Sequence, residues 1–303
     1  VGEATRFDKI FDARYTSRIR FAGDASLGFS FPFVNGSISY KIIQPDYVSL
    51  GTYYTSNNYQ SLGASLSTML FRRISLSGNF SMQNDNLSKK QLYTNNGYVY
   101  SAMASYNHTC GFSISGMFNG YLQRQDDGAA VVNDTTRVNR ELRSVTIMPS
   151  YSHSGENFDH SVSLSANYTE NIDHNRFNIG MSDVQTLALG ASYNLGVKPW
   201  EMDFGLSSSM QQSKGFNSKY TSVVTSLSTG RGFLKDKNLN VSASVSLCYN
   251  HVQYTSKSLS MALDLNASYS LKQAHIFSAS ASFSKYGDVN PTQTRSSLDA
   301  TDI

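Results

Sequence analysis

Residues 239–250 decide the fold class, and they read Leu-Asn-Val-Ser-Ala-Ser-Val-Ser-Leu-Cys-Tyr-Asn. Apolar side chains occupy every odd position from Leu239 to Tyr249, and serine, asparagine or cysteine occupies every even one. Successive side chains of a β-strand point to opposite faces. The stretch therefore predicts a strand with one wholly apolar face and one polar, uncharged face.

The same period of two recurs along the chain. Between Ile74 and Gln83, apolar residues and glycine alternate with serine, asparagine and glutamine, and Phe158–Tyr168 repeats the pattern. Many alternating segments of about ten residues, separated by turn residues, are the signature of a transmembrane β-barrel. We predict an all-β fold, a transmembrane antiparallel up-and-down β-barrel with about 14 strands visible and about 14 to 16 in the complete barrel.

The barrel is expected at 17–286, preceded by a loop or incomplete segment at 1–16 and followed by a loop or tail at 287–303. The expected strands are 17–31, 37–55 (interrupted at Pro45), 62–71, 74–83, 97–106, 112–122, 142–151, 158–169, 186–195, 200–212, 220–228, 239–250, 258–269 and 276–286. Connections alternate between short and long, with long loops at 123–140 and 170–183. Bacterial outer-membrane barrels have short periplasmic turns and longer outer loops, so the alternation predicts an orientation.

Composition supports a bacterial outer-membrane location. No run of about 18 apolar residues exists, which excludes a helical span. The chain holds 19 Tyr and 17 Phe but only 16% charged residues, and aromatic rings gather at the two membrane interfaces. The expected periplasmic girdle consists of Tyr106, Phe112, Tyr151, Phe158, Tyr193, Trp200, Tyr269 and Phe277.

Four carboxylates take the polar parity of their expected strands: Asp159, Glu201, Asp203 and Asp264. With Asn240, Ser242 and Ser244 they are the predicted lumen-lining residues. A charge facing lipid costs a few kcal/mol, whereas one in a watery lumen stays hydrated. One interpretation is a cation-favouring pore lining. The other, which we favour, is ordinary hydrated residues paired with Lys or Arg from the opposite wall.

No pattern predicts catalysis, a metal or a cofactor. The six histidines are spread without metal-ligand spacing, and the two cysteines form no CxxC motif. Asp126-Asp127-Gly128 with Asp134 hints at Ca²⁺ but matches no EF-hand, so a flexible surface loop is favoured. A net charge of +3 without a dense basic run gives no reason to expect nucleic acid. A barrel hydrolase would need His, Ser and a carboxylate to converge at one rim.

One stretch resembles a known group of proteins. Residues 40–51 read Tyr-Lys-Ile-Ile-Gln-Pro-Asp-Tyr-Val-Ser-Leu-Gly, followed by Tyr53-Tyr54 and Asn57-Asn58. With Leu76-Ser77-Gly78-Asn79 and Gln83-Asn84-Asp85-Asn86-Leu87, this resembles a strand-and-loop motif of outer-membrane β-barrel proteins from Bacteroidota. Most of that group is uncharacterised, so the resemblance implies an outer-membrane location in a diderm bacterium and transfers no functional residue.

The expected function is non-catalytic. We favour a passive, porin-like channel for small solutes, because a barrel of about sixteen strands is wide enough for an aqueous lumen. The alternative is a structural or accessory subunit of a larger outer-membrane complex, which would dock on a flat strip of small outward residues. Candidates for that strip are Gly78, Gly116, Gly120, Ala279 and Ala281. Expected partners are the lipid bilayer, lipopolysaccharide and, for the alternative, other outer-membrane subunits.

Overall fold

The structure is a single antiparallel sheet in which every strand pairs with the next one along the chain. This computed structural model describes residues 20–47, 57–178, 180–233, 238–253, 256–271, 275–288 and 301–302. The strands are β1 (Ala22–Ser30), β2 (Val34–Ile43), β3 (Tyr59–Leu70), β4 (Ile74–Asp85), β5 (Tyr93–Asn107), β6 (Phe112–Asp127), β7 (Asn139–Ser154), β8 (Phe158–Asp173), β9 (Val184–Val197), β10 (Met202–Gly215), β11 (Ser218–Phe233), β12 (Leu239–Val252), β13 (Ser256–Leu271), β14 (His275–Asp288) and β15 (Thr301–Asp302). The predicted all-β, up-and-down class is confirmed, and the described residues form fourteen long strands and the two-residue β15.

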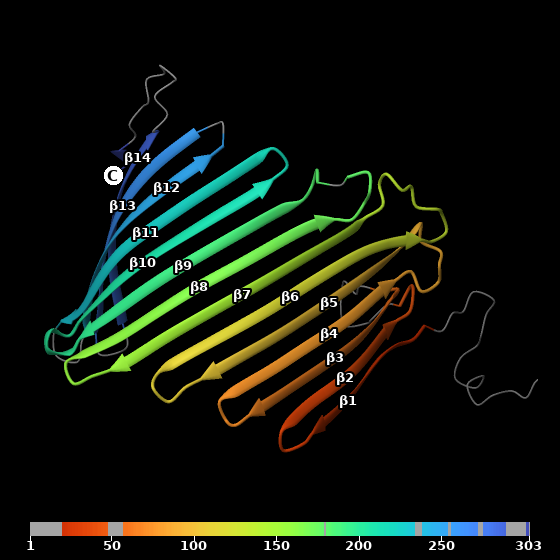
Figure 1. Cartoon of the computed structure of the whole chain (residues 1–303), viewed down its shortest axis with the longest axis horizontal. Coiled ribbons are helices and arrows are strands. Elements are labelled where there is room, and N and C mark those ends of the chain that lie inside the picture. Colours follow the sequence, from red (N-terminus) through yellow and green to blue (C-terminus); the bar gives the residue numbers. More distant parts are fainter. Residues whose placement is uncertain are drawn as a thin grey trace, which may run out of the picture.

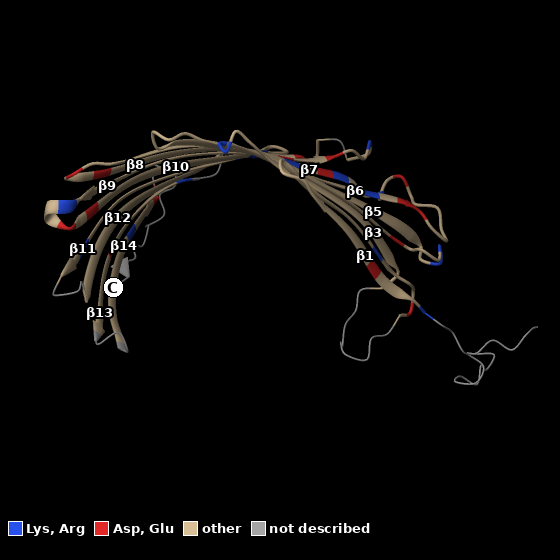
Figure 2. Cartoon of the chain, turned by 90° about the horizontal axis from the view of Figure 1, so that it is seen from below, with Lys and Arg blue, Asp and Glu red and all other residues tan. Residues whose placement is uncertain are grey.

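The sheet curves into an arch (Figures 1 and 2). Strands β1 and β14 lie on opposite sides of the arch, and within the described residues no pairing joins them. Strand β15 extends the order by pairing Thr301 with Lys285 and Asp302 with Ser284 of β14. The described part of the chain is therefore a curved sheet of the kind that forms β-barrels, and this sheet is called the wall below.

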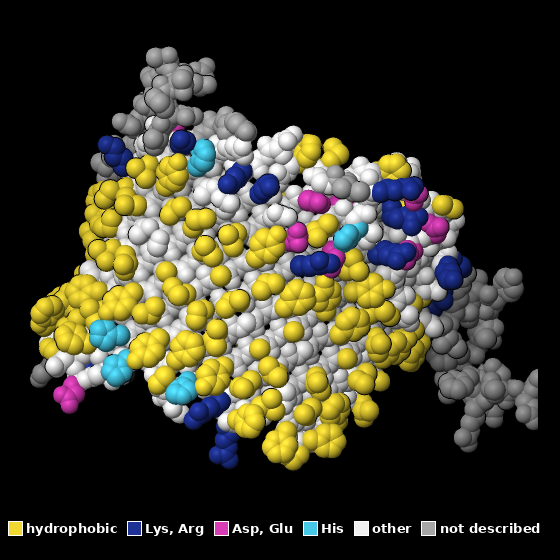
Figure 3. All heavy atoms as spheres, in the orientation of Figure 1, with side chains coloured by type: hydrophobic (Ala, Val, Ile, Leu, Met, Phe, Trp, Pro, Cys, Tyr) yellow, Lys and Arg dark blue, Asp and Glu magenta, His cyan; other side chains and the backbone are white. Residues whose placement is uncertain are grey.

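The register places like residues beside like. In β12, Val245 stands opposite Leu227 of β11 and Leu263 of β13, while Ser244 stands opposite Ser228 and Asp264. A slip by one residue would exchange the two faces of a strand, so the alternation fixes the register. Apolar side chains cover the convex face in a broad band (Figure 3), and the polar parity therefore lines the concave face.

The wall has almost no interior of its own. Among the described residues only two hydrophobic side chains, Val132 and Val197, are buried, and apolar residues such as Leu227 remain 57% exposed. A soluble domain buries its apolar face against a second layer, and no such layer covers this one in the described residues. The convex face therefore needs an apolar medium around it.

Tight turns join the strands at the end predicted to be periplasmic. Phe71 and Arg72, between β3 and β4, have φ of 52° and 54°, which matches the two-residue hairpin turns whose twist suits paired strands. Gly111 precedes β6 with φ of 87°, and a Cβ there would overlap the carbonyl oxygen of Ser152. Glycine is the residue that accepts both the dihedral angle and the close approach.

Several predicted strand boundaries are wrong near proline and glycine. The strand expected at 37–55 ends at Ile43, and Pro45 and Asp46 form a turn in which Asp46 has φ of 59°. Proline has no N–H for the ladder, so it stops this strand instead of interrupting it. Residues 48–55 of the expected strand, and 17–19 of the first one, lie outside the described residues.

The outer connections are shorter than predicted. Strands β6, β7 and β8 continue into the loops expected at 123–140 and 170–183, because ladder bonds join backbone groups whatever the side chains. Strands β10 and β11 are joined by Phe216 and Asn217 alone, with Asn217 at φ of 56°. The alternation of short and long connections therefore fails at the β10–β11 hairpin.

Candidate functional site

The concave wall is built from small polar side chains. Serines on neighbouring strands bond in direct cross-strand pairs, such as Ser163 with Ser192 and Ser207 with Ser226, each at 2.6 Å between the Oγ atoms. Small hydroxyls that satisfy one another leave room above the sheet and carry no charge. This surface suits contact with water.

Six of the seven residues predicted to line the lumen lie on this concave parity. Asp159 and Asp203 both stand opposite Gly196, and Asp264 stands opposite Ser244. The other three are Asn240, Ser242 and Ser244 of β12, opposite Gly232, Gly230 and Ser228. Within the described residues Asp203 and Asp264 have no ion pair, whereas Asp159 pairs with Lys198 at 3.1 Å. Lys198 comes from a neighbouring turn, not from an opposite wall.

Glu201 corrects the prediction, because it is not a strand residue. It follows the short 3-10 helix η2 (Lys198–Trp200) in the left-handed conformation, with φ of 51°. The alternation of faces applies only within a strand, so counting parity from Trp200 assigned Glu201 to the lumen without a structural basis.

A hollow of about 390 Å³ lies on the concave face near the turns that are predicted to be periplasmic. Its lining includes Gly196, Gly205 and Gly230 together with the polar Asn194 and Asp203. A Cβ at Gly205 would lie 3.1 Å from the Asn194 Oδ1. The glycines therefore leave space beside groups that accept hydrogen bonds.

The predicted girdle residues lie at the ends of the strands near the short turns. Phe112 stands directly opposite Tyr151, and Tyr269 opposite Phe277. The remaining four are Tyr106 opposite Ile114, Phe158 opposite Val197, Tyr193 opposite Leu206, and Trp200, 61% exposed in η2. Their role at a membrane interface stays a prediction.

A polar cluster at the outer end of the convex face was not predicted from the sequence. Glu141 is only 8% exposed. Its carboxylate accepts bonds from the Tyr100 hydroxyl at 2.7 Å and from the Arg143 Nε and terminal nitrogen, each at 2.7 Å. The His174 Nε2 lies 2.9 Å from the same carboxylate. The sequence does contain a sign of this cluster: Glu141 and Arg143 are charged residues at outward positions of β7, where the other outward residues are apolar. Such charges mark the end of the apolar band.

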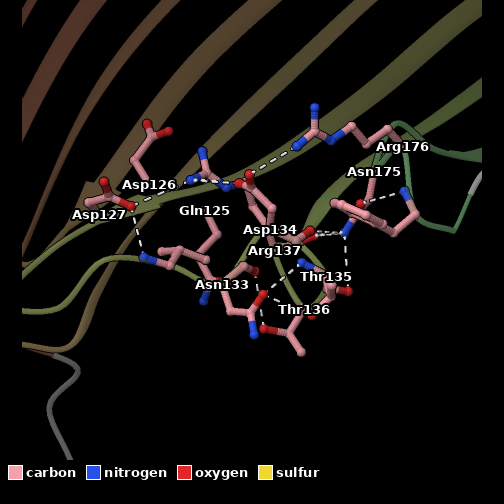
Figure 4. Close-up of polar contacts among 12 residues, drawn as sticks. Gln125, Asp126, Asp127, Asn133, Asp134, Thr135, Thr136, Arg137, Asn175 and Arg176 are labelled. Carbon is pink, nitrogen blue, oxygen red and sulfur yellow. Dashed lines mark hydrogen bonds and ion pairs between the residues drawn. The ribbon is translucent and has the colours of Figure 1, made fainter.

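Two outer loops are tied together beyond this cluster (Figure 4). Asn175 is 6% exposed, and its Nδ2 donates to the carbonyl oxygens of Asp134 at 3.0 Å and Arg137 at 2.9 Å. Arg137 also pairs with Asp127 and Asp134, at 3.5 and 3.3 Å, and Arg176 pairs with Asp134 at 3.3 Å. The carboxylates that hinted at Ca²⁺ are therefore neutralised by arginine, and the loop is a braced structure.

Replacing Asn175 tests this bracing. In Asn175→Ala we expect trypsin to cleave after Arg137 about tenfold faster, because losing these bonds costs about 1.4 kcal/mol of local stability. Asn178→Ala is the control, since the Asn178 Nδ2 makes one long bond, at 3.5 Å to Asp173. Equal cleavage rates in the two variants, measured by electrophoresis of the intact protein, would show that Asn175 does not hold the loops.

The part of the chain that the structure describes contains neither a metal-binding cluster nor a membrane-spanning helix. No group of three or more His, Cys, Asp or Glu there could hold a metal ion. No helix there is long and apolar enough to cross a membrane.

The two faces together define the class of protein. On the convex side of β12 the apolar band covers the eleven residues from Leu239 to Tyr249, and a membrane-spanning strand needs about 9 to 11. On eight strands a polar or charged residue is the first outward residue past this band. These residues are Arg124 (β6), Arg143 (β7), Glu170 (β8), Gln185 (β9), Gln212 (β10), His251 (β12), Lys257 (β13) and Lys285 (β14). An apolar, lipid-facing band on the convex face and a polar concave face are the features of an outer-membrane β-barrel protein.

No model of a protein family matches the chain, and no curated protein matches it either. Among solved structures it is similar to the alcaligin outer-membrane receptor FauA from Bordetella pertussis, with 11% identity and a TM-score of 0.38 over 88% of this chain. The chain spans 61% of the length of FauA. It is also similar to OccK10 (OpdN) from Pseudomonas aeruginosa, with 10% identity and a TM-score of 0.31, covering 89% of this chain and 94% of that one.

Proposed function

We propose that the protein forms a passive outer-membrane channel for small hydrophilic solutes. The observation that supports this proposal is the concave wall, which carries serine, asparagine and glycine on the inward positions of strand after strand. Large barrels leave an aqueous lumen when their inward side chains do not fill it. Passage through such a lumen needs no catalytic step and no cofactor. The resemblance at residues 40–51, 53–54, 57–58, 76–79 and 83–87 supports the further proposal that the protein comes from a member of the Bacteroidota.

Conductance tests the channel directly. The purified full chain, added to a planar bilayer in about 1 M KCl, is expected to give stepwise, long-lived openings with an ohmic current, as a water-filled pore does. Insertion is checked separately by flotation with lipid vesicles. Flotation with the vesicles combined with a conductance near zero would sink the channel proposal.

The lumen carboxylates give this channel a charge preference. Asp203 and Asp264 face the concave side and have no ion pair among the described residues, so they favour cations. In the double variant Asp203→Asn/Asp264→Asn we expect the cation-over-anion permeability ratio to fall by roughly two- to fivefold, about 1 kcal/mol at most in a hydrated lumen. Reversal potentials in a KCl gradient measure it. Glu156→Gln, which removes a carboxylate from the turn after β7, should leave the ratio unchanged; an equal fall in both would remove the two aspartates from the permeation path.

The alternative is a structural or accessory subunit of a larger outer-membrane complex. It is favoured by the edge of the sheet at β1, which pairs with β2 alone within the described residues. An unpaired edge presents backbone groups to which further strands can bond. The small outward residues Gly78 and Gly116, with Ala102 and Ala104, also line a convex hollow of about 520 Å³. Mass measurement in detergent separates the two: a monomer that conducts supports the channel, and a non-conducting chain in a stable complex supports the subunit.

A further inference from the structure

Four lysines stand on the outward parity of β10, β11, β13 and β14 just beyond the apolar band. They are Lys214, Lys219, Lys257 and Lys285, and all four are exposed. Lys285 follows the outward Phe283, and Lys257 precedes the outward Leu259, so both lie where the band ends. In the space-filling view of the convex face, lysine and arginine side chains follow its upper left edge (Figure 3).

These lysines lack counter-charges among the residues that the structure describes. None of the four makes an ion pair among the described residues. Lys214 and Lys219 stand directly opposite each other in the β10–β11 pair, and like charges in that position destabilise a sheet. On the outward positions beyond the band, the described parts of β10–β14 carry no Asp or Glu. No described residue of β10–β14 compensates the positive charge there.

The neighbouring part of the same rim is different. On β6 and β7 the outward Arg124 pairs with Asp126 at 3.1 Å, and Arg143 pairs with Glu141 at 2.7 Å. That half satisfies its own charges within the protein. The contrast indicates that the lysine half is completed by an anion from outside.

We propose that the outer ends of β10–β14 bind the phosphate groups of lipopolysaccharide in the outer leaflet. A lysine at the edge of the band lays its alkyl stem along apolar surface and presents its ammonium at headgroup level. Phosphate is an anion that a lysine point charge binds well. An anion between Lys214 and Lys219 would relieve their repulsion, and the acyl chains of the same lipid would lie against the apolar band below. This proposal requires that the ends of β10–β14 that carry the lysines lie at the outer leaflet. It does not require that the lumen conducts ions.

Binding of a phosphorylated lipid to the purified full chain tests the site. Native mass spectrometry in a neutral detergent would follow binding of diphosphorylated lipid A, with the dephosphorylated lipid as comparison. Near an anionic surface each lysine contributes about fivefold in affinity, so Lys214→Gln/Lys219→Gln is expected to bind roughly 25-fold more weakly. The charge-matched control Arg72→Gln/Arg73→Gln removes two positive charges from the β3–β4 turn at the opposite end of the strands and should bind as the parent does.

Three results would overturn the proposal: unchanged affinity in the lysine variant, equal loss in both variants, or equal binding of phosphorylated and dephosphorylated lipid. Displacement of the lipid by millimolar inorganic phosphate would overturn the assignment to a lipid. Should Lys214→Gln/Lys219→Gln fail to fold, which the heat-dependent shift in electrophoretic mobility reveals, Lys257→Gln/Lys285→Gln carries the same expectation. Either outcome is independent of the conductance measurement.

Discussion

Val245→Arg is expected to lower the free energy of unfolding by about 2–4 kcal/mol, the cost of an arginine at the midplane of a bilayer. Val245 lies in the middle of the outward band of β12, between Leu227 and Leu263 on the adjoining strands. A guanidinium there has no counter-ion and no water within the band. Guanidinium titration of the protein in phosphatidylcholine vesicles measures the change.

The adjacent residue supplies the control. Ser244 lies on the opposite face of the same strand, opposite Ser228 and Asp264. Ser244→Arg puts the same side chain in the polar concave space, near a carboxylate, and should change stability by no more than about 0.5 kcal/mol. If Ser244→Arg were the more damaging of the two, the faces would be assigned the wrong way round.

Gly120→Ala is expected to destabilise the outer end of the sheet by about 1–3 kcal/mol, the usual range for overpacking. Gly120 stands directly opposite Tyr100, whose ring covers the space that a Cβ at Gly120 would occupy. Added bulk must push the ring aside, and the Tyr100 hydroxyl then loses its bond to the buried carboxylate of Glu141. Loss of that hydrogen bond adds to the steric cost, although the carboxylate keeps its two bonds from Arg143.

Gly116→Ala is the matched control for this variant. Gly116 lies on the same strand and the same face, but a Cβ there meets only the Thr146 carbonyl oxygen, at 4.0 Å. We expect a change within about 0.5 kcal/mol. Equal unfolding midpoints for the two alanine variants in the same vesicles would mean that Tyr100 is not held over Gly120 as described.

The strand order and the two faces could be predicted from sequence because both follow from period two. Every odd residue of 239–249 lies on the convex side, as its alternation indicates. Boundaries were less predictable. Pro45 was taken as an interruption of a strand and proves to lie past its end, and Gly230 and Gly232 were left out of β11 although the ladder continues to Phe233. Glycine weakens a strand without ending it when both neighbours pair.

The positions of the site residues could be predicted only where they follow the alternation of the two faces along a strand. Asp203 and Asp264 lie on the concave parity that counting along their strands gave them, whereas Glu201 lies between η2 and β10, where counting by strand parity does not apply. The bond from Asn175 to the carbonyl of Arg137 joins loops 38 residues apart, and no local pattern signals such a contact. The cluster around Glu141 was readable in principle, since a carboxylate and a guanidinium on the lipid-facing parity mark the end of the band.

The central claim is that the convex face lies in lipid and the concave face in water. Spin labels placed singly at residues 240–247, in a background with Cys110 and Cys248 replaced by serine, test it by collision with paramagnetic probes in vesicles. Oxygen, which dissolves in lipid, should relax the labels most at the odd positions, and a water-soluble nickel chelate should do so at the even ones. An accessibility profile without a period of two, or with the two probes exchanged, would contradict the account.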